Sequence, residues 1–286
     1  MKKTLIAACV ALLATGLAQA ADTLTKIKDS AAVTMGVRES SGALSYTLGD
    51  GKYAGFHVEV CERVLADVKK KLGLAKMEVK YQPVTSQNRI PLVQNGTVDI
   101  ECGSTTNNIP RQKDVAFAVT TFMTEVRIAT KVASGITGIA QLNSRNVATT
   151  TGTTSVQLLR KHERATGVDF KEVYGKDHAD SFLLMDTGRA DAFVMDDYIL
   201  AGLIAKAKNP AEYRMVGEPL SLEPIAIMLR KEDPAFKKAV DESLTAMMKS
   251  GDLTKILAKF GLTPGEDTKK AWATPNDKPA EDYAKK

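Results

Sequence analysis

The polar run ECGSTTNNIPRQ, from Glu101 to Gln112, carries side chains that could take part in chemistry. Hydroxyl and amide groups follow one another in it, and Arg111 stands near its end. Such a run could contain a nucleophilic serine, a phosphate-binding turn or a site for another small anion. Ser104 would be the nucleophile, but the G-x-S-x-G pattern that exposes one is missing, and no histidine stands in an obvious triad pattern. An anion site is the better interpretation.

Arg111 is one of five side chains, charged or able to carry a charge, that each follow a predicted strand. The set comprises Arg38, Arg89, Arg111, His178 and Asp196. An arginine binds a carboxylate through two parallel hydrogen bonds, and each charge-assisted bond contributes about 1.5–3 kcal/mol. Because one carboxylate does not need three arginines, the set indicates a small ligand with two carboxylates and an ammonium. Asp196 would hold the ammonium.

Hydroxyl groups accompany these charges. Ser86 precedes Arg89 closely, and Thr153 and Thr154 belong to a hydroxyl-rich run. The helices that follow would aim their free N–H groups at the same place, which favours anions. The alternative is structural, because Ser86, Thr153 and Asp180 also suit helix N-cap positions.

Several other classes of site lack their motifs. The histidines His57, His162 and His178 have neither HExxH spacing nor cysteine partners, so we expect no metal site. We interpret His57 and His162 as surface residues. The chain has no G-x-x-x-x-G-K-[ST] loop, so we expect no nucleotide and no other cofactor.

Strand and helix patterns alternate along the chain, which predicts an α/β fold with parallel sheets. In the first part the predicted strands are 32–37, 78–81 and 97–101, and the predicted helices are 56–72 and 88–94. In the middle the strands are 146–150, 170–173 and 191–195, and the helices are 155–165 and 180–186. The polar clusters follow the strand ends, and open α/β sheets bind ligands at that edge.

The alternation suggests two lobes built on one plan. Residues 95–100 and 187–192 share one layout, a helix end, a glycine, and an aspartate that opens a strand. Two extended segments could join the lobes, one at 122–131 and one near 213–222. The first lobe would then include the C-terminal helices, predicted at 234–250 and 253–260. We expect the tail from Thr263 to be loosely ordered, because Lys, Asp, Pro and Ala dominate it.

The N-terminus predicts export. Lys2 and Lys3 precede an apolar segment, and Ala18-Gln19-Ala20 forms a cleavage site, so residues 1–20 match a signal peptide cut after Ala20. No other segment approaches the roughly 20 apolar residues of a membrane span. The formal net charge is +5, of which Lys2 and Lys3 contribute two, and the basic residues are scattered, so we expect no nucleic-acid partner.

Two cysteines remain after removal of the signal peptide, Cys61 and Cys102. In an oxidising compartment such a pair is often a disulfide, and both positions fall in the same predicted lobe. The alternative is two buried thiols. No C-x-x-C motif indicates a redox site.

Taken together, the motifs resemble the periplasmic amino-acid-binding proteins of ABC importers, most closely the glutamate/aspartate-binding subfamily. The resemblance runs from about Leu24 to Gly261. Its motifs are RESS at 38–41, TSQNRIPL at 85–92, ECGSTTNN at 101–108, TTGTTS at 150–155, KDHADSF at 176–182 and MDD at 195–197.

The resemblance implies a type II periplasmic binding protein with two lobes, each a mostly parallel sheet flanked by helices, joined by two hinge strands. Lobe 1 would comprise residues 21–124 and 218–286, and lobe 2 residues 125–217. It further implies capture of L-glutamate or L-aspartate by closure of the lobes, delivery to an inner-membrane ABC permease, and a monomer in the periplasm.

It also implies a role for each site residue. Arg111 and Thr106 would bind the α-carboxylate, helped by Thr153 or Thr154. Ser104 and Asp196 would hold the α-ammonium. The side-chain carboxylate would be bound by Arg38, Ser86, Arg89 and His178.

Two alternatives remain open. An enzyme on the same scaffold is one, since relatives of this fold include a periplasmic dehydratase that acts on a cyclic dicarboxylate. Glu39 or His178 would then have to serve as general acid. The other is the sensory lobe of a receptor. The sequence does not rank glutamate against aspartate, because one methylene is worth only about 1–3 kcal/mol.

Overall fold

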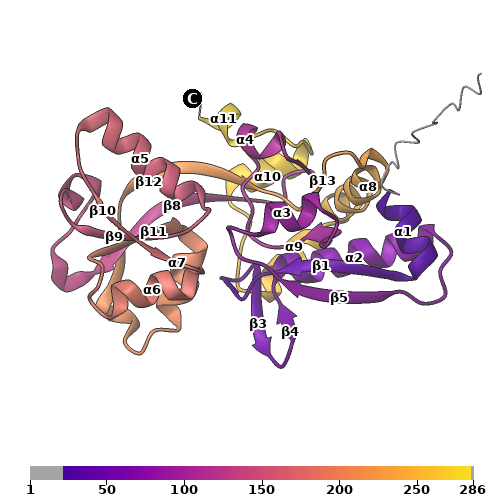
Figure 1. Ribbon diagram of the computed structural model, residues 1–286, viewed down its shortest axis with the longest axis horizontal. Coiled ribbons are helices and arrows are strands. Elements are labelled where there is room, and N and C mark those ends of the chain that lie inside the picture. The colour runs from indigo at the N-terminus through magenta and orange to yellow at the C-terminus, as the bar shows by residue number, and fades with distance from the viewer. Residues whose placement is uncertain (1–21, 285–286) are drawn as a thin grey trace, which may run out of the picture.

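The computed structural model describes residues 22–284 and has two lobes (Figure 1). The predicted signal peptide and its cleavage site lie outside these residues. Lobe 1 is built on a five-stranded sheet of the described chain, in the order β5-β1-β6-β13-β7. Its strands are β1 (Ala32–Val37), β5 (Glu78–Pro83), β6 (Ile100–Glu101), β7 (Val115–Phe117) and β13 (Met228–Arg230). A small hairpin sheet adds β2 (Ser40–Ser41), β3 (Ser45–Gly49) and β4 (Lys52–Ala54).

Lobe 2 is built on a second five-stranded sheet of the described residues, in the order β10-β9-β11-β8-β12. Its strands are β8 (Phe122–Lys131), β9 (Asn146–Thr150), β10 (Lys171–Gly175), β11 (Ala192–Asp196) and β12 (Tyr213–Ile225). The α/β fold class is confirmed, and in each of these five-stranded sheets one strand runs opposite to the other four. In lobe 1, β13 runs antiparallel to both neighbours, and in lobe 2, β8 does the same. These strands are where the chain enters or leaves a lobe, so their direction follows from the crossing.

Helices cover both sheets. Lobe 1 carries α1 (Thr23–Ser30), α2 (Phe56–Lys71), α3 (Arg89–Gln94), α4 (Ile109–Gln112), α8 (Pro234–Ser250), α9 (Asp252–Lys259), α10 (Glu266–Ala273) and α11 (Ala280–Tyr283). Lobe 2 carries α5 (Thr154–Thr166), α6 (His178–Asp186) and α7 (Asp197–Ala205), with short 3₁₀ turns at Val132–Ser134, Ile139–Leu142 and Pro210–Glu212. In α2 the residues at helical spacing, Val60, Val64 and Val68, are buried, so this face forms the lobe 1 core.

Two strands cross between the lobes, β8 and β12, and run side by side (Figure 1). They pair antiparallel from Tyr213 opposite Lys131 to Ile225 opposite Phe122, with an irregularity between Val216 and Ser221. The sequence placed the first segment at the same residues and ended the second slightly early. The crossing brings β12 back to lobe 1, where Thr106 forms a bridge with Ile225.

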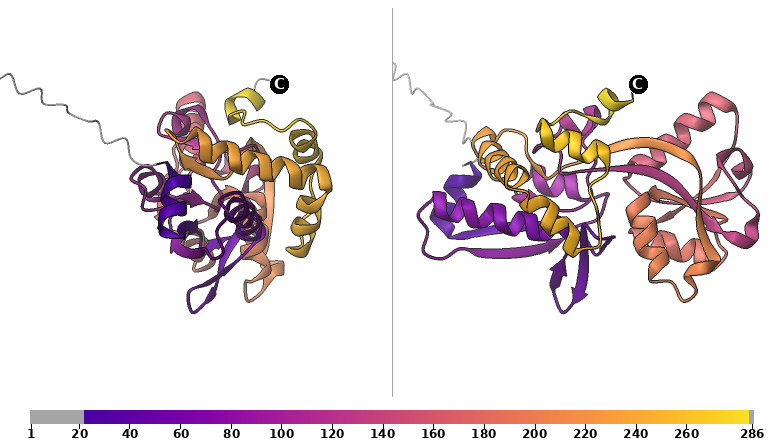
Figure 2. Two further views of the ribbon diagram at one scale, coloured as in Figure 1. Left: turned by 90° about the vertical axis from the view of Figure 1, so that its right-hand side faces the viewer. Right: turned by 180° about the vertical axis from the view of Figure 1, so that it is seen from behind.

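The prediction of a loosely ordered tail is wrong. Residues 263–284, which we call the C-terminal strap, form α10 and α11 and lie against lobe 1 where the crossing strands leave it (Figure 2). The Trp272 indole N–H donates to the Thr121 carbonyl at 3.0 Å, and the Met123 N–H donates to the Thr268 hydroxyl at 3.0 Å. These hydrogen bonds hold the strap against the start of β8, so it is ordered although its composition is polar.

Cys61 in α2 and Cys102 after β6 form a disulfide, which confirms that prediction. Both cysteines are fully buried. The bond therefore fixes the segment that precedes Ser104 against the core of lobe 1. Within the described part of the chain, none of the helices combines the length and apolar character needed to cross a membrane.

Candidate functional site

A small enclosed cavity lies between the lobes, with an empty volume of about 210 Å³. Nine of the ten residues proposed from the sequence line it, together with Met195. They are Ser86, Arg89, Ser104, Thr106, Arg111, Thr153, Thr154, His178 and Asp196. The tenth, Arg38, is fully buried beside the cavity, where Nη1 donates to Ser104 Oγ at 3.3 Å. The fold thus gathers residues from six segments of the sequence, and their binding roles stay predictions.

Arg89 starts α3 and is 2% exposed. Among residues 22–284, its Nε and Nη1 have no hydrogen-bond partner, and the same holds for the neighbouring Ser86 Oγ. Burial lowers the pKa of Arg89 to about 9, and the charge of Arg111 lowers it further while Glu101 opposes the change. A buried guanidinium with free donors is costly, so an anion in the cavity would relieve the cost.

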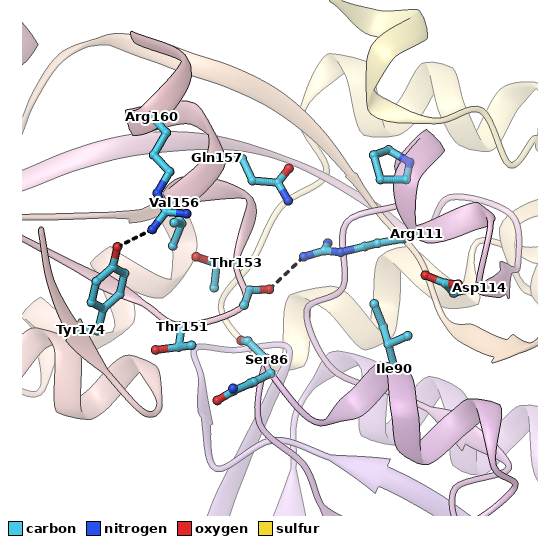
Figure 3. Close-up of a pocket in the computed structure, with 13 residues that line it drawn as sticks. Ser86, Ile90, Arg111, Asp114, Thr151, Thr153, Val156, Gln157, Arg160 and Tyr174 are labelled. Carbon is cyan, nitrogen blue, oxygen red and sulfur yellow. Dashed lines mark hydrogen bonds between the residues drawn. The ribbon is translucent and has the colours of Figure 1, made fainter. Parts of the chain in front are cut away.

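Arg111 is held in place by its own loop. Asn108 caps α4 by accepting from the Arg111 N–H at 2.9 Å, and Pro110 stands in the first turn, where its fixed φ suits a helix start. The guanidinium then donates to the Thr106 carbonyl at 2.9 Å and to the Gly152 carbonyl at 3.2 Å. The second bond crosses from lobe 1 to lobe 2 and lies in a groove beside the cavity (Figure 3).

The lobes approach closely at this point. Gly152 has φ +82°, and a Cβ there would lie 2.8 Å from the backbone of Gln87 and Ser86 in the other lobe. Only glycine fits both the conformation and the space. The structure is therefore a closed arrangement, with direct backbone contact across the site.

Asp196 ends β11 and is 5% exposed. Burial raises the pKa of its carboxyl group well above the usual range, and repulsion from Glu223 and Asp197 raises it further. The Tyr198 hydroxyl donates to it at 3.5 Å. A cation in the cavity would stabilise the ionised form, which fits the predicted contact with an ammonium.

Asp177, which links the lobes, was not among the site residues expected from the sequence. Its carboxylate accepts from the Arg38 guanidinium and from Ser40 Oγ, the latter at 2.5 Å. Burial alone would raise its pKa, but the charges of Arg38 and His178 and the two hydrogen bonds lower it to about 2. The ion pair joins β2 and its neighbourhood in lobe 1 to the start of α6 in lobe 2. It depends on contact between lobes, which no local pattern reveals.

His178 adds no positive charge, although it was counted as a potential cation. Burial lowers its pKa to about 3, and the nearby Arg38 lowers it further. The ring nitrogens lie 3.2 Å from Arg38 Nη2 and 3.0 Å from Thr150 Oγ1. A neutral imidazole donates from one ring nitrogen and accepts at the other, and because a guanidinium only donates, Nε2 is the acceptor here.

His57 was wrongly interpreted as a surface residue. It is fully buried, with Nδ1 2.5 Å from the Gly103 carbonyl and Nε2 2.7 Å from Thr121 Oγ1. Since a carbonyl only accepts, Nδ1 carries the proton. His57 thus connects the segment before Ser104 to the start of β8. Its apolar neighbours Phe56 and Val58 were the available signal.

The capping interpretation holds only in part. Asn88 and Asp177 occupy the N-cap positions of α3 and α6, so Ser86 and Asp180 do not cap these helices. Thr153 is the N-cap residue of α5, but its hydroxyl donates to the Thr150 carbonyl at 2.7 Å.

Glu223 was also missed. It lies on β12 and is 3% exposed, and it accepts hydrogen bonds from Thr106 and Thr154. An acid inside the otherwise apolar run Leu222-Glu223-Pro224-Ile225 was a signal that could have drawn notice. Among the described residues, no group of three or more His, Cys, Asp or Glu side chains could hold a metal ion.

Comparisons with known proteins show the family to which the chain belongs. The family model described as bacterial extracellular solute-binding proteins, family 3, matches residues 33–263. The chain is 40% identical over 297 residues to the glutamate/aspartate import solute-binding protein of Escherichia coli, covering 97% of this chain and 98% of that one. It is 44% identical over 273 residues to the L-glutamate/L-aspartate-binding protein of Pseudomonas aeruginosa, covering 91% and 90%.

A solved structure also resembles the chain. The ancestral amino-acid-binding protein AncCDT-1, a precursor of cyclohexadienyl dehydratase, matches with a TM-score of 0.71 and 27% identity over 84% of this chain and 99% of that one. The curated relatives at 40–44% identity are transport-binding proteins rather than enzymes. Binding is therefore favoured over the dehydratase-like alternative.

Proposed function

Because this chain belongs to family 3 of the bacterial extracellular solute-binding proteins, we propose that it captures L-glutamate or L-aspartate and delivers it to an ABC importer of the inner membrane. The observation that carries the proposal is the buried Arg89, whose Nε and Nη1 lack partners among residues 22–284. A ligand with a second carboxylate supplies the missing acceptor, while a neutral side chain does not.

Capture occurs by closure of two lobes, residues 21–124 with 218–286 and residues 125–217. The Arg111 bond to Gly152 and the Arg38 pair with Asp177 are contacts that only the closed form allows, which supports this mechanism. The protein acts as a monomer in the periplasm, after removal of residues 1–20 on export.

Each end of the ligand has its own set of groups. Arg111 binds the α-carboxylate from lobe 1, and α5 presents free N–H groups of its first turn from lobe 2. Ser104 and Asp196 hold the α-ammonium. The side-chain carboxylate is bound by Arg38, Ser86, Arg89 and His178.

Isothermal titration calorimetry with L-glutamate, L-aspartate and L-glutamine tests the proposal. We expect tight binding of one or both acids. We expect L-glutamine to bind at least about 100-fold more weakly, because an amide N–H₂ facing Arg89 leaves buried donors unpaired. Equal affinity for L-glutamine would contradict the charge pairing, and no binding of either acid would contradict the proposed ligand.

A further inference from the structure

Glu223 joins the two lobes at the site through hydrogen bonds that it accepts. The Thr106 hydroxyl of lobe 1 donates to Glu223 Oε2 at 2.5 Å, and the Thr154 hydroxyl of lobe 2 donates to the same oxygen at 2.9 Å. Ser221 donates to the other oxygen at 2.8 Å. One buried carboxylate on a crossing strand therefore orients a hydroxyl from each lobe.

The direction of these bonds limits what the hydroxyls can do for a ligand. A hydroxyl group has one hydrogen to donate and two lone pairs that accept. Thr106 and Thr154 donate their hydrogens to Glu223 and also line the cavity. Their oxygens can therefore only accept from a ligand. An ammonium, which carries three donors, fits such oxygens, whereas an ionised carboxylate has nothing to donate.

The charge of Glu223 favours the same group. Within residues 22–284, its hydrogen-bond donors are neutral hydroxyls. Arg111 interacts electrostatically with this buried negative charge, and an ammonium beside it would stabilise the charge further. Next to burial, Glu223 is the largest cause of the raised pKa of Asp196, so two carboxylates act on one region of the cavity.

We infer that Glu223 is a positioning residue that makes the site select ligands carrying an α-ammonium group. It sets the Thr106 and Thr154 hydroxyls as acceptors and adds negative charge beside Asp196. The α-carboxylate is then bound by Arg111 and the α5 N–H groups rather than by these two hydroxyls. This inference rests on the proposed function and refines it.

The test compares L-glutamate with glutarate, the same dicarboxylate without the amino group, by calorimetry on the full mature chain. Glu223→Gln keeps the shape and removes the charge. We expect it to weaken L-glutamate binding at least about tenfold and to change glutarate binding less than about twofold. A role limited to supporting β12 predicts equal losses for both ligands, and that result overturns the inference. Glu218→Gln, an exposed acid on the same strand, is the matched control.

Two further variants keep the test decisive if Glu223→Gln does not fold, as judged by its thermal unfolding. Thr106→Val and Thr154→Val each remove one oriented hydroxyl oxygen. We expect each variant to weaken the binding of L-glutamate more than the binding of glutarate. A larger loss for glutarate means that the hydroxyls face the carboxylate, which overturns the inference.

If the wild-type protein binds neither acidic amino acid, the proposed ligand is wrong, but the ammonium test still applies. It is then run with whichever amino acid stabilises the protein against heating and with the analogue of that amino acid that lacks the amino group. Glu223→Gln must again discriminate between the two.

Discussion

Arg89 and Arg111 are both buried arginines of lobe 1, yet they differ in what holds them. The Arg111 guanidinium donates to two backbone carbonyls, while Arg89 Nε and Nη1 lack partners among the described residues. Arg111 is therefore positioned by the protein itself, whereas Arg89 relies on the ligand. A substitution at each position should separate a general contact from a specific one.

We expect Arg89→Met to weaken L-glutamate binding by roughly 10- to 150-fold, equivalent to about 1.5–3 kcal/mol, and to affect L-glutamine little. Arg111→Met should weaken both ligands. Calorimetry measures the ratio of the L-glutamate and L-glutamine affinities in each variant. Arg160→Met serves as control, because it removes an exposed arginine of the groove beside the cavity. Similar losses of both ligands in Arg89→Met would assign Arg89 a general role.

His57 gives a pH dependence to stability. Burial lowers its pKa to about 4, compared with 6.5 in the unfolded chain, so the unfolded state binds more protons between these values. Because of this group, the free energy of unfolding falls as the pH drops from 6.5 to 4, by up to about 1.4 kcal/mol per pH unit. We expect His57→Gln to reduce that slope in urea unfolding series at pH 7, 6, 5 and 4. An unchanged slope would mean that His57 does not contribute.

Much of the site could be predicted at this scale. Arg38, Arg111 and Asp196 follow strand ends, so their common location follows from the α/β rule. Glu223 and Asp177 could not be found in that way, because Glu223 depends on Thr106 and Thr154, and Asp177 on Arg38, which lie far away in the sequence. The neutral state of His178 depends on its burial and on the charge of Arg38 in the other lobe, which the local sequence does not reveal.

At the scale of elements, the C-terminal strap supports the segment that carries Arg111. The Asn107 side chain donates to the Asp277 carbonyl at 2.8 Å, and the Ala280 N–H donates to the Asn107 carbonyl at 2.9 Å. Glu281 accepts from the Ile109 N–H at 3.0 Å, at the start of α4. The strap thus bonds both to this segment and to the start of β8.

We expect deletion of residues 265–286 to lower the free energy of unfolding by several kcal/mol, at roughly 1 kcal/mol per lost hydrogen bond plus the lost packing of Trp272. The deletion should also weaken the binding of every ligand, because the segment that carries Arg111 loses its hydrogen bonds to the strap. Denaturant unfolding and calorimetry measure the two effects, and removal of residues 285–286 alone is the control. An unchanged free energy of unfolding in the long deletion would show that the strap does not stabilise the fold.

The elements themselves were largely predictable. Helical spacing in α2 and the alternation of strands placed the regular elements within a few residues of the structure. The strap was missed because its composition is polar. Its order depends on Trp272, the partly buried tryptophan, and on backbone groups that composition does not reveal.

At the scale of the whole molecule, the Asp177 carboxylate stabilises the contact between the lobes, since it accepts hydrogen bonds from Arg38 and Ser40 in lobe 1. Its lowered pKa, about 2, keeps it ionised at neutral pH. This stabilising contribution is present above the ordinary pKa of 3.8 and is lost as pH falls toward 2.

We expect Asp177→Asn to weaken all ligands by a similar factor, about three- to tenfold, because the closed form loses an ion pair without loss of ligand contacts. Stopped-flow measurements should find the change mainly in the release rate. Asp180→Asn, an exposed acid on the same helix, is the control. A change in the ranking of ligands would instead mean that Asp177 acts through the cavity.

The course of the chain also places both ends of the described structure on lobe 1, with α1 at one end and the strap at the other (Figure 1). The exposed turn at Gly167, after α5, belongs to lobe 2. A fluorescent protein inserted at this turn and a second one fused to the C-terminus would therefore be attached to different lobes. Energy transfer between them should change on closure, so the chain offers a scaffold for an optical sensor of its own ligand.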